Sequence, residues 1–215
     1  GANALYANTT ASYNSAFGYL ALSANTTGAN NVAVGGLSLD ANTTGDQNVA
    51  VGTSALGALT AGDKNVAIGN STLSQFNVTD GSETFNTAVG YAAGGAVTTG
   101  IQNTLIGGLA GDALTDADKN VAVGRSALTS DTLGSMSTAI GYSALDSQNF
   151  TSATTSRNTA VGHTAGLSST TAVDNTLIGE QAGYYITTGS QNTILGRFSG
   201  NQDGLDIRTA SNHIV

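Results

Sequence analysis

The chain has 215 residues, of which only 9% are charged, with no cysteine, proline or tryptophan and a formal net charge of −8. The lack of cysteine excludes a disulfide scaffold and a cysteine-ligated metal. The negative charge argues against nucleic acid or an anionic membrane as a partner. The sequence contains no run of about 18 apolar residues, so no membrane-spanning segment is predicted.

A five-residue phrase of the type Asn-Val-Ala-Val-Gly recurs along the chain, as at residues 48–52. Its glycines follow a 17-residue period, except that Gly90 and Gly162 each follow a 21-residue interval. A fixed period of about 20 residues is typical of a solenoid, in which each coil buries its apolar face only against its neighbours. The two longer intervals recur with a 72-residue period, which indicates duplication of a four-coil block. Gly1 also matches the motif glycines, so we expect the chain to begin within a repeat.

Each coil is predicted to contain two short strands and two turns, which together form a flattened two-sided β-roll. We therefore expect an all-β parallel solenoid of about 12 coils, with a 21-residue coil at every fourth, and a length on the order of 60 Å. The β-roll repeat domain is predicted to span residues 1–200. Residues 201–215 are predicted to begin a C-terminal segment that leads out of the repeats. The thin roll, with small uncharged faces and open edges, favours association.

The strand of each coil is predicted at the second to fourth residues of the phrase, where alternate side chains point to opposite faces. The fourth residue is always bulky and apolar, so we expect it to fill the interior. The third residue is usually alanine, and this column is assigned to a subunit interface. The predicted core comprises Val34, Val51, Ile68, Val89, Ile106, Val123, Ile140, Val161, Ile178 and Leu195.

A second segment of the type Gly-x-x-Ala-x follows each strand. Its last residue is leucine in seven coils and glycine in five. In three of the glycine coils the third strand residue is larger than alanine, namely Leu105, Leu177 and Ile194. This pattern predicts an exchange of volume between two facing columns. Gly94 and Gly166 do not follow it, because the strands before them carry alanine.

The first residue of the phrase forms a column of asparagines, which Ser137 interrupts once. Because the column lies where a turn enters a strand, we interpret it as a structural ladder of stacked, hydrogen-bonded amides. A ligand-binding ladder is the alternative. The predicted ladder comprises Asn31, Asn48, Asn65, Asn86, Asn103, Asn120, Asn158, Asn175 and Asn192.

The phrases Asn-Val-Ala-Val-Gly and Asn-Thr-Ala-Val-Gly, followed by Gly-x-x-Ala, resemble the head repeats of YadA-like trimeric autotransporter adhesins. The 17-residue coil with Asn-Thr-Thr-Gly turns, as at 25–28 and 42–45, is similar to repeat regions of phage tail fibres. Residues 200–215 are similar to the segment that joins such repeats to a self-cleaving chaperone domain. The resemblance covers essentially the whole chain and implies a homotrimer of left-handed parallel β-rolls. The longer coil and the four-residue insertions depart from the adhesin heads.

No nucleophile, base and acid recur together, and neither histidine has a partner at ligand spacing, so we predict no catalytic residue, metal site or cofactor. The acidic turns at Asp112, Asp116 and Asp118 lack the glycine-rich pattern of calcium-binding rolls.

Two insertion loops, residues 74–85 and 146–157, are the best candidates for recognition, since aromatic residues on protruding loops suit glycan or protein contact. Alternatively, the rings fill gaps between neighbouring chains. The candidate receptor contacts are Phe76, Phe85, Phe150, Tyr184 and Tyr185.

We expect a structural and adhesive protein: an extracellular, stiff, trimeric segment of a viral tail fibre that presents loops to a glycan or protein receptor on the host. The head of a bacterial cell-surface adhesin is the alternative of the same class. An ice-binding β-solenoid is the alternative of another class, since threonine recurs at the second strand position, as at Thr87 and Thr104. Against it, this position is valine in other coils and is predicted to share the interior face. An enzyme is not expected.

Overall fold

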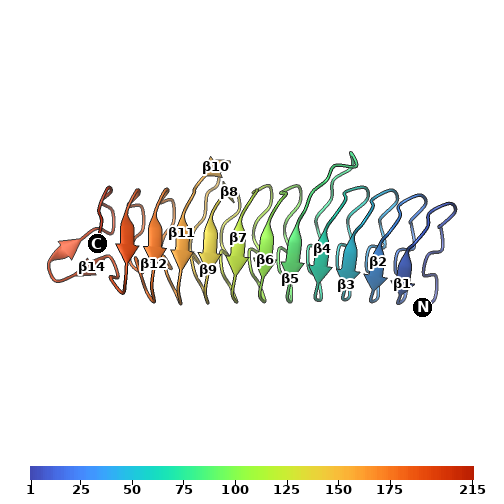
Figure 1. The fold of residues 1–215 in the computed structure, drawn as a ribbon, viewed down its shortest axis with the longest axis horizontal. Helices are drawn as coiled ribbons and strands as arrows, with labels where there is room; N and C mark the ends of the chain where they lie inside the picture. The colour runs from blue at the N-terminus through green and yellow to red at the C-terminus, as the bar shows by residue number, and fades with distance from the viewer.

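The computed structural model describes all 215 residues, and it forms a single all-β rod with the two termini at opposite ends (Figure 1). Eleven short strands lie side by side in one parallel sheet, one strand from each coil. The strands of this sheet are β1 (Ser15–Phe17), β2 (Val32–Val34), β3 (Val49–Val51), β4 (Val66–Ile68), β5 (Thr87–Val89), β6 (Thr104–Ile106), β7 (Val121–Val123), β9 (Thr138–Ile140), β11 (Thr159–Val161), β12 (Thr176–Ile178) and β13 (Thr193–Leu195). The predicted parallel solenoid is confirmed.

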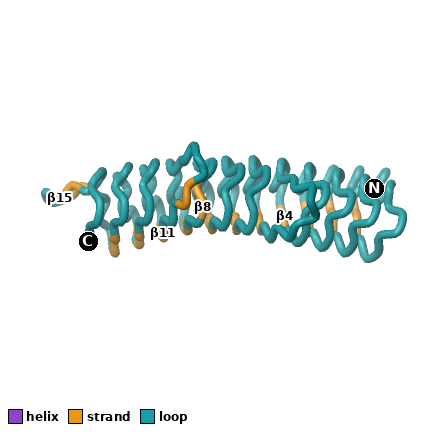
Figure 2. Tube along the Cα trace, turned by 90° about the horizontal axis from the view of Figure 1, so that it is seen from above, coloured by secondary structure: helices purple, strands orange, loops and turns teal.

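Two short strand pairs lie outside the main sheet. The parallel pair consists of β8 (Gly134–Ser135) and β10 (Thr154–Thr155), and the antiparallel pair of β14 (Asn201–Gln202) and β15 (Leu205–Asp206). Seen from above, the strands of the main sheet follow one side of the rod and the turns follow the other (Figure 2). No helix with the length and hydropathy of a membrane span occurs in the chain.

Equivalent residues of successive coils are in register throughout the main sheet. Val34 pairs with Val51, and Val51 pairs with Ile68 one strand further on. The same register continues across the longer interval before Gly90, where Ile68 pairs with Val89. The four extra residues therefore form a loop and do not shift the sheet, because any slip would break the alignment of the columns.

The second segment of each coil forms a ladder of turns, where a strand was predicted. In the third coil Ser54 and Leu56 have φ angles of 56° and 51°, in the left-handed region. The Ser54 N–H donates to the carbonyl of Gly36 in the coil before (3.0 Å), and the Leu56 N–H donates to the carbonyl of Thr72 in the coil after (3.1 Å). Left-handed backbone costs a non-glycine residue about 1–2 kcal/mol. The hydrogen bonds to both neighbouring coils offset that cost.

The interior of the rod is formed by the third strand residue and by the leucine of the second segment. Ala50, Leu56, Ala67 and Leu73 are all fully buried in one continuous core cluster. The alanine column therefore faces inward, and its assignment to a subunit interface is wrong. The leucine of the second segment fills the space opposite the strand, so in most coils the facing strand position has room only for a methyl group.

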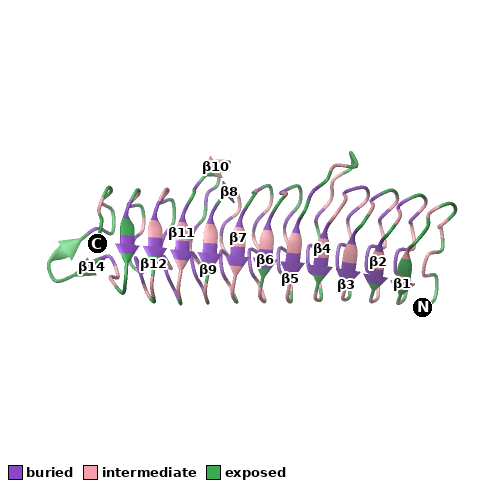
Figure 3. Ribbon diagram, viewed as in Figure 1, coloured by how far each residue is buried: buried purple, intermediate pink, exposed green.

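The fourth strand residues point outward, so the prediction that they form the core is wrong. Val34 is 37% exposed and Ile68 is 39% exposed. In Figure 3 most arrows of the main sheet are purple over part of their length and pink over the rest, because buried and half-buried residues alternate along each strand. The outward-facing residues are Val34, Val51, Ile68, Val89, Ile106, Val123, Ile140, Val161, Ile178 and Leu195.

Leu105 explains the exchange between leucine and glycine. A Cβ atom on Gly111 would lie 2.8 Å from Leu105 Cδ2, and one on Gly94, in the coil before, would lie 2.7 Å from Leu105 Cδ1. Leu105 thus fills the space that two leucines, at 94 and 111, would otherwise occupy. This accounts for glycine at 94, although the strand of that coil carries alanine. Leu177 repeats the arrangement at the equivalent place in the next four-coil block.

The glycine that ends each strand is required by both conformation and space. Gly35 has a φ angle of 135°, and a Cβ on it would lie 2.6 Å from the carbonyl oxygen of Gly52 in the next coil. Only glycine combines such a φ angle with so close an approach of two backbones.

The solenoid continues past residue 200, so the predicted domain boundary there does not divide the structure. Ile207 is fully buried in the core cluster. The His213 N–H donates to Asn192 Oδ1 (3.0 Å), and the Val215 N–H donates to the Thr193 carbonyl (2.9 Å). Residues 201–215 therefore form a further rung, in which the β14–β15 hairpin occupies an insertion.

Candidate functional site

The asparagine column is engaged in hydrogen bonds along its length. Asn48 is typical: its N–H donates to Asn31 Oδ1 (2.8 Å), and its Nδ2 donates to the Gly62 carbonyl (2.8 Å). Asn103 makes the same two bonds, to Asn86 Oδ1 and to the Ala117 carbonyl. The column is buried, and the Asn48 amide joins the start of its own strand to the turn and to the strand entry of the next coil. This geometry is that of a structural ladder.

A buried network crosses the gap at Ser137. Gln148 Nε2 donates to Ser137 Oγ (3.2 Å) and to Asp131 Oδ2 (2.6 Å), while Gln148 Oε1 accepts from Asn158 Nδ2 (2.8 Å). The other carboxylate oxygen of Asp131 accepts the N–H groups of Gly134 and Phe150, at 3.1 and 3.0 Å. Sequence reasoning missed Gln148 and Asp131, since neither belongs to the repeated phrase.

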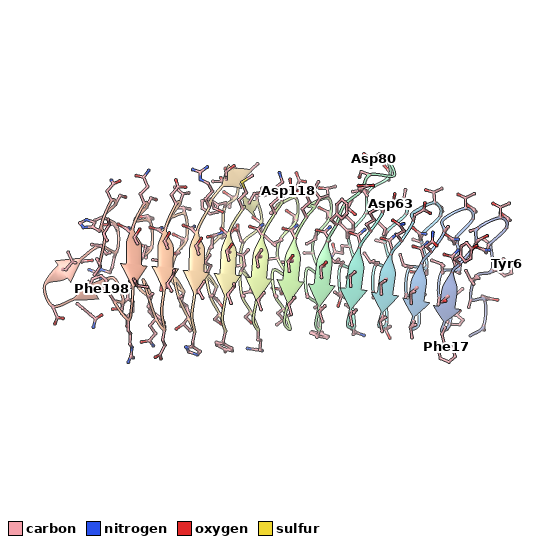
Figure 4. The ribbon with its side chains drawn as sticks, viewed as in Figure 1. Tyr6, Phe17, Asp63, Asp80, Asp118 and Phe198 are labelled. Carbon is pink, nitrogen blue, oxygen red and sulfur yellow. The ribbon has the colours of Figure 1, made fainter.

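The two insertion loops differ from the prediction in what they expose. Phe76 is fully buried and Phe150 is 6% exposed, so both rings pack inside their own chain and are excluded as receptor contacts. Phe85 remains exposed beside Lys64, whose Nζ lies 5.3 Å from its ring centroid. The loop that follows β4 rises above the other turns, and Asp80 lies at its tip (Figure 4).

The outward residues of the main sheet form a long uncharged surface. We call the fourth strand residues from Val34 to Ile178 the outer stripe. They run in register along the sheet, and each is flanked by valine or threonine at the second position. Phe17 and Leu195, at either end of the stripe, are 75% and 76% exposed. A continuous apolar surface of this extent is typical of a protein interface.

Acidic residues line the edge of the rod where the turns enter the strands. Asp63 Oδ1 accepts the N–H of Asp46 in the coil before (2.7 Å), and Asp118 Oδ1 accepts that of Ile101 (2.8 Å). Burial raises the pKa of Asp63, and the neighbouring charge of Asp46 adds to the effect. Figure 4 places Asp63 and Asp118 on the same edge. These carboxylates cap backbone groups of the adjoining coil.

An exposed stack of planar side chains is formed in three successive coils by the residue that follows the strand-ending glycine. The rings of Tyr142 and His163 lie 5.4 Å apart and nearly parallel, with an angle of 12° between them. The guanidinium carbon of Arg125 lies 5.8 Å from the Tyr142 centroid. These three residues occupy the same position in successive coils. They are of different types, so no repeated motif in the sequence reveals the stack.

A pocket of about 410 Å³ lies near the C-terminal end of the rod, and no residue of the outer stripe lines it. Tyr184 and Tyr185 meet there edge to face, with ring centroids 4.8 Å apart. Tyr185 is 51% exposed and Tyr184 is half-buried. The lining residues are Gln181, Tyr184, Tyr185, Arg197, Ser199 and Gln202. Of the predicted recognition residues, the structure brings only the two tyrosines together.

No three histidine, aspartate or glutamate side chains lie together where they could hold a metal ion. Comparison with protein-family models, with curated proteins and with solved structures finds no match to this chain. The fold by itself defines a class, the parallel β-solenoid repeat proteins.

Proposed function

We propose that the chain is a stiff segment of a homotrimeric fibre: an extracellular part of a viral tail fibre that carries receptor-binding surfaces to the host. The outer stripe is the observation that supports this proposal most. It is apolar, uncharged and in register along the sheet, so a copy of the same chain offers a matching surface of the same length. Three stripes packed around a common axis would bury what one chain leaves exposed.

The parallel ladder supports the mechanical part of the proposal. Both the strand and the turn side of each coil are hydrogen-bonded to the next coil. Bending the rod would therefore lengthen the hydrogen bonds on its convex side and compress the coils on its concave side. A solenoid of this kind can hold exposed groups such as Phe85 and Tyr185 at a fixed spacing from the rest of a fibre. A glycan or protein receptor on the host surface is the partner that we propose for them.

The mass of the chain in solution tests the assembly. We expect light scattering to give a mass three times the 21.2 kDa of one chain. A mass of 21.2 kDa at micromolar concentration would contradict the fibre proposal. The head of a bacterial surface adhesin is the alternative with the same assembly. The full-length protein distinguishes them: a chaperone domain after the repeats supports the tail fibre, and a coiled-coil stalk with a membrane anchor supports the adhesin.

Ice binding is a second candidate, and one observation favours it. Threonine at the second strand position, as in Thr159 and Thr176, points outward beside Val161 and Ile178 of the outer stripe. The objection that this position faces the interior therefore does not hold. Ice binding and trimer assembly would both use the outer stripe, so only one of these two proposals can be correct. A monomer that shows thermal hysteresis supports ice binding, and a trimer without hysteresis excludes it.

A further inference from the structure

The pocket near the C-terminal end forms where a regular coil meets the β14–β15 hairpin. The Tyr185 N–H donates to the Ser199 carbonyl (2.7 Å), which fixes the tyrosine pair against the segment that enters the hairpin. The Ser199 N–H donates to Gln202 Oε1 (3.1 Å), which fixes the glutamine side chain within the lining of the pocket. The pocket is thus lined by side chains whose positions are set by the coil and the hairpin together.

The lining has the chemistry of a sugar site. A pyranose presents a face of C–H groups, which packs on an aromatic ring such as the half-exposed Tyr185, and a rim of hydroxyl groups. Planar amides and hydroxyls bind such hydroxyl groups in pairs, and Gln202 and Ser199 supply them here. The volume of about 410 Å³ lies within the range of small-molecule sites, about 300–1,000 Å³.

Arg197 gives the pocket its charge preference. Its Nε and Nη2 donate to Gln181 Oε1, at 3.2 and 2.9 Å, and no carboxylate forms an ion pair with it. Its Nη1 donates no hydrogen bond within the chain. The pocket lining contains no aspartate or glutamate. A guanidinium that is held in place and free of a carboxylate partner is suited to a carboxylate from a ligand.

We propose that this pocket binds a pyranose sugar that carries a carboxylate, such as a uronic or a nonulosonic acid. Tyr185 packs on the C–H face of the sugar, and Gln202 and Ser199 bind its hydroxyl groups. Arg197 receives the carboxylate through its free N–H groups. The inference rests on the proposed host-binding function and names the class of its receptor as an acidic glycan.

Titration of the full chain with glucuronate and with N-acetylneuraminate, followed by NMR, tests the pocket. Glucose and galactose serve as neutral probes. We expect both acids to bind with a Kd on the order of 1 mM, as a single exposed sugar would, and to perturb the resonances of residues 181–185 and 197–202. Neutral sugars should bind at least about tenfold more weakly, since they lack the charge-assisted bonds. Equal binding of acidic and neutral sugars, or no binding of the acids, would overturn the proposal.

Four variants separate the roles within the pocket. Arg197→Gln should weaken the binding of the acidic sugars by at least about tenfold and abolish the preference over neutral sugars. Arg197→Lys should retain part of that preference. Tyr185→Ala should weaken the binding of acidic and of neutral sugars by a similar factor. Arg125→Gln removes an exposed arginine elsewhere and should change nothing. Acid binding that survives Arg197→Gln unchanged would overturn the assignment.

The outcome is independent of the test of assembly, because no residue of the outer stripe lines the pocket. A monomeric chain that binds glucuronate through Arg197 supports this site and contradicts the fibre. A trimer that binds no acidic sugar supports the fibre and contradicts this site.

Discussion

At the scale of single residues, the structure depends on how volume is shared across a very thin interior. The core cluster is largely alanine and leucine, and few side chains in it are larger. Where a leucine replaces an alanine in the strand, glycine replaces the facing leucine both in that coil and in the coil before. Each coil is therefore matched to its neighbours, and the spacing of the repeat leaves little space to absorb a mismatch.

Exchange of the paired side chains around Leu105 tests this volume rule. Leu105→Ala should leave a cavity and cost about 2–5 kcal/mol of the free energy of unfolding. Gly111→Leu should cost about 1–3 kcal/mol by overpacking, since its Cβ would already lie 2.8 Å from Leu105. The triple variant, with Gly94→Leu added, restores the alanine–leucine arrangement of other coils. Urea denaturation should show the triple variant to be more stable than either single variant, and additive losses would refute the rule.

Two aspartates should affect stability with opposite dependence on pH. Burial and Asp46 raise the pKa of Asp63, so its contribution is present at acidic pH and is lost as the pH rises through that raised value. The hydrogen bond from Arg157 lowers the pKa of Asp174, so its contribution is present at neutral pH and is lost as the pH falls through that lowered value.

At neutral pH, Asp63→Asn should therefore raise the melting temperature slightly, because asparagine keeps the acceptor for the Asp46 N–H and removes the charge. Solvent screens the half-buried Asp63 carboxylate, so we expect the substitution to raise the free energy of unfolding by less than about 1 kcal/mol. Asp174→Asn should lower the melting temperature at the same pH. Thermal melts at about pH 3 and pH 7 measure both effects, and shifts of the same sign in the two variants at pH 7 would contradict the assignment.

At the scale of the repeated element, the asparagine ladder is what joins the turn to the strand. The amide of Asn103, for example, satisfies the backbone N–H of Asn120, which precedes the next strand, and the backbone carbonyl of Ala117 in the next turn. Both groups are buried and have no access to water. The ladder therefore stabilises the coil by satisfying groups that would otherwise be costly to bury.

Asn103→Ala should remove the acceptor for the Asn120 N–H and the donor to the Ala117 carbonyl. We expect a loss of about 1–3 kcal/mol for each group left unsatisfied. Asn70→Ala is the matched control, since Asn70 is exposed and its side chain accepts a hydrogen bond only from the hydroxyl of Ser71. Chemical denaturation of the two variants should differ by several-fold in the loss of stability. Equal losses would show that the ladder is not the stabilising feature.

At the scale of the whole molecule, one apolar surface decides how the rod associates. The interior of each coil is filled without the fourth strand residues, which leaves them half exposed on the outer stripe. No charged residue lies among the outward positions of the sheet. The acidic turns lie at an edge, so they do not oppose contact between two sheets (Figure 4).

A charge in the middle of the outer stripe should separate the subunits without unfolding them. We expect Ile106→Glu to convert the trimer into a monomer, because an unpaired carboxylate would be buried at the axis. Thr53→Glu, on an exposed turn, should leave the assembly intact. Sedimentation gives the mass, and far-UV circular dichroism shows whether the sheet persists. A trimer that tolerates Ile106→Glu would place the interface elsewhere.

The sequence by itself determined the period, the parallel register and the position of the loops, because every coil repeats the same hydrogen-bonding and apolar positions. It also indicated the exchange between leucine and glycine, although the glycine at 94 made sense only once Leu105 was placed beside the preceding coil. The tertiary structure decided which face of each strand is inside. Alternation defines two faces but does not say which is buried, and here the leucine of the turn fills the interior, so the smaller alanine faces inward and the larger valine faces outward. The burial of Phe76 and the pocket at Tyr185 were also decided by the tertiary structure, since both depend on which segments of different coils come together.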